Sequence, residues 1–482
     1  MEEPKNITFL KAFTPLLFFI IVLAYGLFIH PLLFEGDRLP VEVLIILAIT
    51  FSSLYLMRQG YSWDHILENI VEKVGESVPV LLILFAIGVL IGSWIVSGTI
   101  PMLIYYGISA ISPDWIYIFS FLICIVFSLL TGTSWGSAGT IGIVMIGIAQ
   151  VYNADICITA GAVVGGSFFG DKLSPLSDTT NIASLATDVP LFDHIRSMMY
   201  TTGPSAIIAA IIYIVLSPAI HGDTSSIGTQ ELDQIQETLI SLESIFSFNV
   251  LLLLPLLVVI YGSIKKKPIF LTLLVSAWLA MILAFIFQPF SFTDIFQSFN
   301  KGFSTEMAAL ENAPAEVLSI LNRGGLYNLI EGIVISFLIF VYIGTLKVMD
   351  SIQLTIAKMM ANLKKRTHLV ASAITTTAFT NLTTSNQYAT SFIIGEAFKS
   401  RFDQMKVPRK VLSRSIEDAG TMLENLAPWT PSGIFMASTL GVSALEYAPY
   451  QFISLINILI AYIFAFTGIA CFFPKRDATH DV

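Results

Sequence analysis

The chain has 482 residues, of which 55% are hydrophobic and only 12% are charged, and its mean hydropathy is +0.79. So apolar a composition excludes a soluble globular protein, because most of the surface must face something other than water. The net charge of -9 is concentrated in loops and indicates no nucleic-acid partner.

Apolar runs that approach the roughly 20 residues needed to cross a bilayer recur along the whole chain. They are residues 15–34, 40–57, 78–97, 203–220, 248–262, 269–288, 329–346 and 451–473. We therefore predict an all-α polytopic membrane protein with about 10 transmembrane helices. Cys124, Cys157 and Cys471 lie in or beside apolar segments and form neither a disulfide framework nor a CxxC metal pair.

Positive charges orient the helices, because loops rich in lysine and arginine stay in the cytoplasm. Lys5 and Lys11 precede the first apolar run, and Lys475 and Arg476 follow the last one, so both termini are predicted to be cytoplasmic. The basic stretches 265–267, 364–366 and 399–414 are assigned to the same side, and the acidic stretch 223–243 to the opposite side.

The order of elements predicts an internal repeat. From residue 41, and again from residue 269, the chain runs through a helix, an amphipathic piece, a helix, a polar tip, a broken segment and a last helix. The charges give the two halves opposite orientations, and such inverted repeats are typical of secondary transporters. The predicted parts are an N-terminal segment with the first helix (1–40), the first repeat (41–222), an acidic extracytoplasmic loop (223–247), a linking helix (248–268), the second, inverted repeat (269–473) and a cytoplasmic tail (474–482).

Two segments are predicted to be re-entrant hairpins, which enter and leave the membrane on one side. Residues 367–399 have a polar middle and positive charge at both ends, and residues 115–152 form their counterpart on the other side. Irregular backbone at membrane depth is tolerated only where protein buries it or where it lines a watery cavity. The polar tips are therefore candidate ion-binding segments, with Thr133, Ser134, Thr384, Ser385 and Asn386. Two short full spans are the alternative for each segment.

Two further stretches are predicted to be broken helices with their interruptions near the midplane. Residues 156–190 are long enough to span, but the sequence GDKLSPLSDTTN lies at their centre, and Pro175 blocks a continuous helix. The second half repeats the pattern at ENLAPWTPSG, with Pro428 and Pro431. Side-chain oxygen, which hard cations such as sodium prefer, surrounds both breaks, at Ser174, Ser177, Asp178, Thr179, Thr180, Asn181, Glu424 and Asn425.

Carboxylates deep in a bilayer cost roughly 3 kcal/mol or more each, so they are functional candidates by default. Asp178 is the principal candidate because no basic residue adjoins it, and Asp171 is the second; both are predicted to bind the sodium ion. For Asp171 the alternative is a structural ion pair with Lys172. Glu424 and Asp418 are weaker candidates, because they follow a basic cytoplasmic segment.

Long motifs in the chain resemble the NhaC-type sodium/proton antiporter family of bacteria. They are GTSWGSAGTIG at 132–142, FFGDKLSPLSDTTNIAS at 168–184 and GIFMASTLGVSALEYAPY at 433–450. That family is similar to the larger ion-transporter superfamily, whose members have paired re-entrant hairpins and broken helices. The resemblance implies exchange of sodium or lithium ions for protons across the bacterial cytoplasmic (inner) membrane. The same family includes exchangers that couple malate uptake and lactate export to these ions, so membership leaves the substrate open.

An antiporter needs one site that holds either a cation or protons. Desolvation raises the pKa of a carboxyl group, so a buried carboxylate can exchange sodium for a proton near neutral pH, while one repeat moves against the other to give alternating access. We therefore predict a sodium/proton antiporter in the lipid bilayer that uses no cofactor. The alternative is a sodium/proton-coupled malate-lactate antiporter, in which Lys172 is the counter-charge for an organic carboxylate.

Two other classes of membrane protein fit the sequence less well. An ion channel needs a continuous selectivity filter, which broken helices disfavour. An enzyme is not expected, because no nucleophile and base pair, metal cluster or phosphate-binding loop is visible. The oligomeric state stays open, a homodimer included.

Overall fold

The structure, a computed structural model, describes residues 8–220, 229–308, 314–360 and 363–473. In these ranges it consists of helices and connecting segments, without a strand. Nine helices of the described part are long and apolar enough to cross a bilayer, or up to 11 segments if two sharply bent helix pairs are counted as one span each. The prediction of an all-α polytopic membrane protein is confirmed.

The first half of the chain contains eleven α-helices, two π-helical turns that join neighbouring helices, and one 3-10 turn. They are α1 (Phe9–Ala24), η1 (Tyr25–Ile29), α2 (His30–Phe34), α3 (Val41–Arg58), α4 (Trp63–Val96), α5 (Thr99–Ala110), η2 (Pro113–Trp115), α6 (Ile116–Thr131), α7 (Ser134–Ser137), η3 (Ala138–Gly142), α8 (Ile143–Val151), α9 (Ile156–Leu173), α10 (Asp178–Ala186) and α11 (Leu191–Ile220).

The second half begins with α12, which bends by 100° into the next apolar helix. Its elements are α12 (Thr229–Ile245), η4 (Val250–Leu253), α13 (Leu254–Ile264), α14 (Ile269–Phe287), α15 (Phe292–Asn300), η5 (Thr305–Ala308), α16 (Ala315–Leu321), α17 (Ile330–Lys347), α18 (Ser351–Met360), α19 (Arg366–Thr384), α20 (Gln387–Gln404), α21 (Arg409–Ile416), η6 (Glu417–Thr421), α22 (Met422–Glu424), α23 (Pro431–Leu440), α24 (Ala444–Tyr447), η7 (Ala448–Tyr450) and α25 (Phe452–Thr467). Helix α12 thus lies inside the stretch predicted as an acidic loop (223–247). Residues 223–228 of that loop and the predicted tail (474–482) lie outside the described residues.

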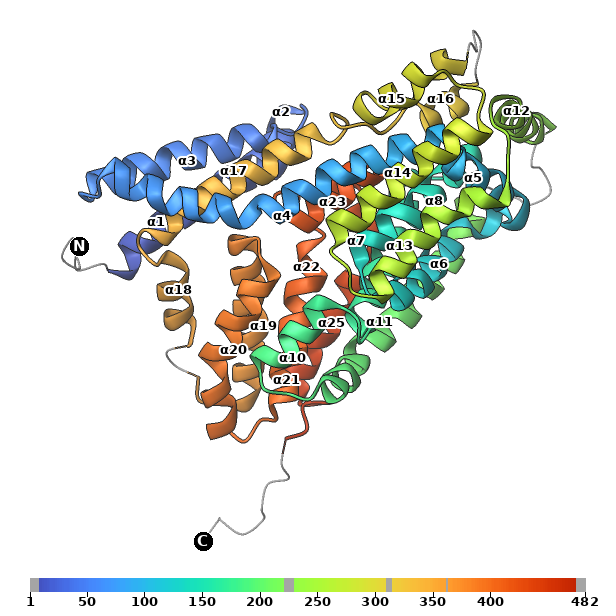
Figure 1. Cartoon of the computed structure of the whole chain (residues 1–482). Coiled ribbons are helices and arrows are strands. Elements are labelled where there is room, and N and C mark those ends of the chain that lie inside the picture. The colour runs from blue at the N-terminus through green and yellow to red at the C-terminus, as the bar shows by residue number, and fades with distance from the viewer. Residues whose placement is uncertain (1–7, 221–228, 309–313, 361–362, 474–482) are drawn as a thin grey trace.

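The amphipathic piece expected before the third apolar run is not a separate element. It is the first part of α4, a single helix of 34 residues that starts where the Ser62 hydroxyl accepts a hydrogen bond from the His65 amide at 3.2 Å. At 1.5 Å per residue this helix measures about 51 Å, well beyond the roughly 30 Å of a hydrocarbon core. Figure 1 shows α4 crossing much of the molecule, and α14 and α17 pack against it.

The two predicted hairpins are helices interrupted at the predicted polar tips. In the first, α6 ends at Thr131 and α7 begins at Ser134; in the second, α19 ends at Thr384 and α20 begins at Gln387. Residues Pro113–Thr131 and Ser134–Val151 are each long and apolar enough to span alone, whereas α19 and α20 are not among the candidate spans. Re-entrance stays a prediction for both hairpins.

Both predicted helix breaks lie where the prolines are. Helix α9 ends at Leu173 and α10 begins at Asp178 on the other side of Pro175, while α22 ends at Glu424 and α23 begins with Pro431. A proline at the first helical position is favourable, because it has no amide hydrogen to leave unpaired. The residues between the half-helices lie outside regular helix, so their backbone and side-chain polar groups are available for bonds in the interior.

The helices that begin the two predicted repeats exchange partners. Helix α3 packs mainly against α17 of the second half, and α14 packs mainly against α4 of the first half. A two-fold relation between the halves predicts this exchange. The inverted repeat itself stays a prediction.

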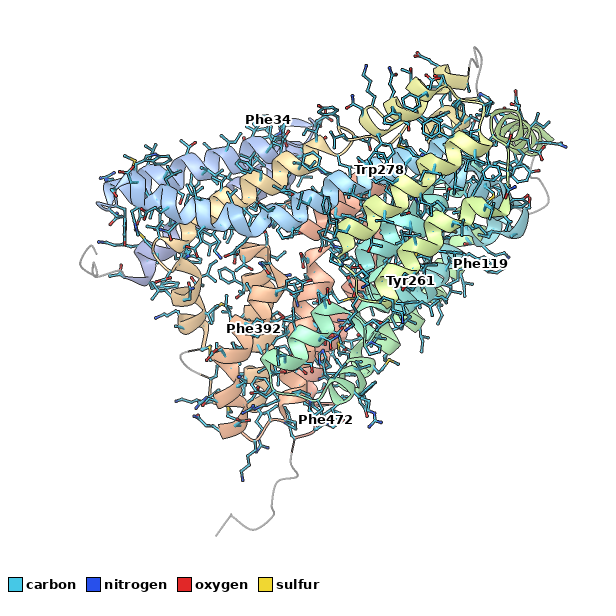
Figure 2. The ribbon with its side chains drawn as sticks, in the orientation of Figure 1. Phe34, Phe119, Tyr261, Trp278, Phe392 and Phe472 are labelled. Atoms are coloured by element: carbon cyan, nitrogen blue, oxygen red, sulfur yellow. The ribbon has the colours of Figure 1, made fainter. Side chains whose placement is uncertain are left out.

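Large apolar side chains cover the outside of the helical assembly, as a lipid-facing surface requires. Figure 2 labels examples from distant parts of the chain, of which Phe34 is 64% exposed, Tyr261 61% and Trp278 51%. Exposed apolar side chains of this kind agree with the apolar spans predicted to lie in a bilayer.

Candidate functional site

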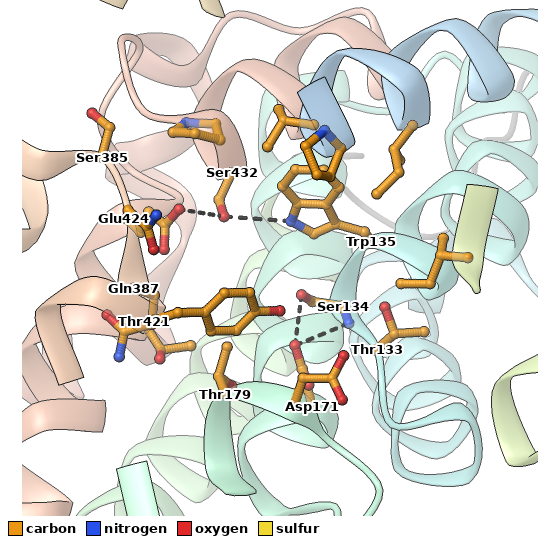
Figure 3. Close-up of a pocket in the computed structure, with 18 of the residues that line it drawn as sticks. Thr133, Ser134, Trp135, Asp171, Thr179, Ser385, Gln387, Thr421, Glu424 and Ser432 are labelled. Atoms are coloured by element: carbon orange, nitrogen blue, oxygen red, sulfur yellow. Dashed lines mark hydrogen bonds between the residues drawn. The ribbon is translucent and has the colours of Figure 1, made fainter. Parts of the chain in front are cut away.

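Four interruptions of the helices meet at one cavity of about 300 Å³. They are the gaps between α6 and α7, α9 and α10, α19 and α20, and α22 and α23. Figure 3 shows the side chains around this cavity. Its polar lining consists mainly of Thr133, Ser134, Asp171, Asp178, Thr179, Ser385, Asn386, Gln387, Thr421, Glu424 and Ser432. Both halves of the chain therefore build one polar site.

A polar side chain caps the helix that follows each interruption. The caps are Thr133, Ser177, Asn386 and Thr430, which accept hydrogen bonds from the amides of Gly136, Thr180, Ala389 and Gly433 at 3.2, 3.4, 3.0 and 3.2 Å. Such caps satisfy amides that would otherwise lack a partner at a helix start. The four helix starts are thereby fixed around the cavity.

Asp171 is the buried carboxylate of the first half, with 7% of its surface exposed. Its Oδ2 atom accepts two hydrogen bonds from Ser134, one from the amide at 3.1 Å and one from the hydroxyl at 2.8 Å. Figure 3 shows both bonds, with Thr133 beside them. The tip of the first hairpin is thus held against the broken helix α9.

Glu424 is the corresponding carboxylate of the second half and is also 7% exposed. Its Oε1 atom accepts a hydrogen bond from the Ser432 hydroxyl at 2.9 Å, and that hydroxyl oxygen accepts one from Trp135 Nε1 at 3.4 Å. The Trp135 ring stacks on Phe435 with 4.3 Å between the ring centroids. Helix α7 of the first half therefore touches α23 of the second half at the cavity (Figure 3).

Asp178, the principal carboxylate of the sequence prediction, lines the same cavity but is exposed. It is the first residue of α10, where a negative charge is favoured by the helix dipole. Its carboxylate accepts no hydrogen bond from any residue that the structure describes. Of the two aspartates predicted to bind sodium, the structure buries Asp171 and leaves Asp178 on the open side.

Lys172 is paired with Asp418 and not with Asp171. Its Nζ atom lies 2.5 Å from Asp418 Oδ1, and the two side chains are 0% and 1% exposed. Thr201 and Asn457 donate to the same carboxylate oxygen at 2.9 and 3.0 Å. Lys172 does not line the cavity, so its charge is neutralised by a partner of its own outside the site.

Six further predicted site residues do not line the cavity; instead, they lie in the interruptions or at the helix ends beside them. They are Ser174, Ser177, Thr180, Asn181, Thr384 and Asn425. Ser174 donates to the Leu129 carbonyl at 3.0 Å, and Thr180 donates to the Lys172 carbonyl at 2.9 Å. These bonds give hydrogen-bond partners to backbone carbonyl groups next to the breaks, so the residues stabilise the backbone that surrounds the cavity.

Several cavity residues were not predicted from the sequence. Gln387, Thr421, Tyr388 and Glu76 line it, together with Trp135. Gln387 is the last residue of the polar tip TTSNQ predicted for the second hairpin, but it was not among the predicted ion-binding residues. Thr421 and Glu76 lie inside helices with no local pattern that distinguishes them.

The cavity carries acidic charge. Glu76, Asp171, Asp178 and Glu424 line it, and no lysine or arginine is among its described lining residues. In the described part of the chain, no group of three or more histidine, cysteine, aspartate or glutamate side chains could hold a metal ion. A cation in this cavity would therefore need a mixed set of carboxylate, hydroxyl and amide oxygens, which suits a hard ion.

Broken helices that meet at a polar cavity inside a polytopic helical protein define the class of secondary membrane transporters. The sequence comparisons name the family within that class. A sequence model described as the Na+/H+ antiporter family matches residues 166–469, and this chain belongs to that family.

Three related proteins extend the match to nearly the whole chain. The chain is 39% identical to an "Uncharacterized Na(+)/H(+) antiporter" of Haemophilus influenzae, over 96% of each chain. It is 34% identical to "Na(+)/H(+) antiporter NhaC" of Alkalihalophilus pseudofirmus, over 90% of each chain. It is 30% identical to a "Malate-2H(+)/Na(+)-lactate antiporter" of Bacillus subtilis, over 95% of this chain and 94% of that one.

Proposed function

We propose that this chain is a secondary active antiporter that exchanges sodium ions for protons across a cell membrane by alternating access. The observation that carries the proposal is the acidic cavity, in which four carboxylates and several hydroxyls meet without a basic side chain among the described lining residues. Oxygen ligands of this kind attract a hard cation, and their negative charge disfavours an anion. The names of two of the relatives above support the same reaction.

Asp171 is the carboxylate that we assign to the exchange step. An ionised carboxylate only accepts, and can bind a cation, whereas its protonated form carries a hydrogen on one oxygen and no charge. Sodium and a proton therefore compete for the same group. The hydroxyls of Ser134 and Thr133 supply neutral oxygen close by, and Asp178 supplies a second charge on the exposed side of the cavity.

Alternating access requires the two halves to move against each other around this cavity. The bond from Trp135 to Ser432 and the stacking of Trp135 on Phe435 join the halves there, so these contacts would be remade in each cycle. We further propose that lithium can replace sodium, that both termini are cytoplasmic and that the membrane is the bacterial cytoplasmic membrane. We propose no cofactor and no enzymatic activity.

The second candidate function is exchange of organic carboxylates, which the name of the Bacillus subtilis relative supports. Such a substrate needs a positive partner in the site. Lys172, the counter-charge expected from the sequence, is bonded to Asp418 and lies outside the cavity lining. This arrangement favours sodium/proton exchange over carboxylate exchange.

Purified protein in lipid vesicles tests the proposed function. A proton gradient is imposed, sodium is added without any organic acid, and the internal pH is followed with a dye. We expect sodium to dissipate the gradient, Asp171→Asn to abolish that response, and Asp178→Asn to weaken it. A wild-type response that appears only with malate or lactate would favour the second candidate function.

A further inference from the structure

A second, smaller cavity adjoins the cavity at Asp171 and Glu424, which we call the main cavity. The second one has a volume of about 100 Å³, and we call it the side cavity. Three residues line both cavities, and they are Glu76 of α4, Phe340 of α17 and Asn386 at the start of α20. Of these three, Glu76 carries a charge. An ion that moves between the two cavities therefore passes the Glu76 carboxylate.

The carboxylate of Glu76 is held by a lysine from the side cavity. Lys73 Nζ donates to both carboxylate oxygens, at 2.8 and 2.9 Å, and Lys73 lines the side cavity but not the main cavity. The side chains of Lys73 and Glu76 are 22% and 39% exposed. Ion pairs with this exposure contribute little to stability, so another cation can displace the lysine at little cost.

The turn of α4 that carries Glu76 lacks one regular helix hydrogen bond. Pro79 lies inside α4 and has no amide hydrogen, so the carbonyl group of Gly75 does not receive the bond that a helix normally supplies. Gly75 adds backbone freedom, and the space around it is open. Pro79 also lines the main cavity. The backbone therefore constrains Glu76 less than a regular helical turn would.

The preceding turn of α4 carries a similar ion pair that does not reach the main cavity. Glu72 pairs with Lys347 of α17, and Lys347 lines the side cavity. Glu72 is not among the described lining residues of either cavity. Two pairs of a glutamate with a lysine thus lie one turn apart, and the pair of Glu76 is the one at the junction of the cavities.

We propose that Glu76 captures the transported cation at the junction of the two cavities, where the cation takes the place of Lys73. The inference rests on the proposed function, because the cation is the sodium ion of that exchange. A carboxylate supplies the oxygen that a hard cation prefers, and the displaced ammonium group remains partly exposed to water. When the ion moves on to Asp171, Lys73 binds Glu76 again. The carboxylate thus favours entry of a cation, and the lysine limits how tightly the junction holds it.

Sodium-driven proton flux in vesicles, measured over a range of sodium concentrations, tests this inference. Glu76→Gln should raise the apparent KM for sodium about tenfold, because charge-lined clefts concentrate ions by this factor or more, and should leave the maximal rate unchanged. Lys73→Met should lower the apparent KM by up to about fivefold, or about 1 kcal/mol, because it removes the competing cation. The double variant should behave like Glu76→Gln, since the lysine competes for that carboxylate alone.

Glu72→Gln and Lys347→Met are the matched controls, because each changes the charge of the neighbouring pair, and both should leave the apparent KM unchanged. If Glu72→Gln raises the KM as much as Glu76→Gln does, the effect belongs to acidic charge in general and the inference is wrong. A lower KM for the double variant than for Glu76→Gln alone would also overturn it, because Lys73 would then act without Glu76. Wild-type vesicles without sodium-driven flux would instead contradict the proposed function.

Discussion

Replacing Lys172 by methionine should destabilise the protein without removing a ligand from the cavity. The lysine and Asp418 form an ion pair of 2.5 Å in which neither side chain is more than 1% exposed. Removing one partner of a buried pair typically costs 3–5 kcal/mol, because the other charge stays buried alone. Asp418 would keep its bonds from Thr201 and Asn457 and the nearby Arg414, whose Nε atom lies 3.9 Å away. We therefore expect a loss near the lower limit, about 3 kcal/mol.

A double-mutant cycle isolates the pair from these neighbours. Asp418→Asn removes the charge but keeps a group that can accept from Thr201, so the double variant Lys172→Met/Asp418→Asn should be more stable than the sum of the single losses predicts. We expect a coupling of about 2 kcal/mol, within the range measured for contacting residues. The measurement is equilibrium unfolding in mixed detergent micelles with increasing sodium dodecyl sulfate, followed by tryptophan fluorescence.

A surface pair gives the matched control. Arg409 and Asp403 lie 2.6 Å apart, but their side chains are 33% and 49% exposed, so Arg409→Met should cost less than about 1 kcal/mol. If Lys172→Met costs no more than Arg409→Met, the structural role of Lys172 is refuted. Loss of organic-acid transport at unchanged stability would instead make Lys172 a substrate counter-charge.

The remaining predictions concern the exchange carboxylate, one close contact and the topology. Asp171→Asn should abolish sodium-driven proton flux, while gel filtration still shows a single symmetric peak. The apparent sodium affinity of the wild type should fall as the pH is lowered, because protons compete for the carboxylates. A sodium affinity that does not change with pH would contradict this competition. Gly433→Ala should destabilise the protein by about 2 kcal/mol, because the added Cβ atom would collide with a backbone carbonyl oxygen. Gly75→Ala is the control and should not destabilise the protein, because the space around Gly75 is open. Equal unfolding curves for the two variants would contradict the close contact at Gly433. Single cysteines at Gly36 and Lys266, in a background without native cysteines, should be labelled from outside and inside the cell respectively, and labelling of both from one side would contradict the predicted orientation.

The sequence predicts those parts of the fold that depend on local chemistry. Long apolar runs indicated the spans, and Pro175 and Pro431 indicated the helix breaks, because each signal acts within a few residues. The polar tips at Ser134 and Ser385 could be read in the same way. These local features also identified most of the residue types that surround the cavity.

Contacts between distant segments could not be predicted in this way. Lys172 is adjacent to Asp171 in sequence, which suggested that they pair, but its partner lies 246 residues away. A helix turns by about 100° per residue, so adjacent side chains project in different directions, and here only Asp171 lines the cavity. The Gln387 carboxamide likewise packs against Gly420 on another helix, where an added Cβ atom would collide with it, and no local pattern indicates that contact.

The relative burial of the two aspartates was also beyond the sequence. Asp178 had no basic neighbour and so was ranked first, whereas the structure exposes it at the start of α10 and buries Asp171. Burial depends on how α6, α9 and α20 pack around the break. No spacing within residues 170–181 encodes that packing.

Sodium-driven proton flux in vesicles that contain only the purified protein is the direct test of sodium/proton exchange at Asp171. With a preset pH gradient and no organic acid, sodium or lithium should collapse the gradient, potassium should not, and Asp171→Asn vesicles should not respond. A gradient that persists when sodium is added to wild-type vesicles, or one that collapses equally well with Asp171→Asn, would contradict it.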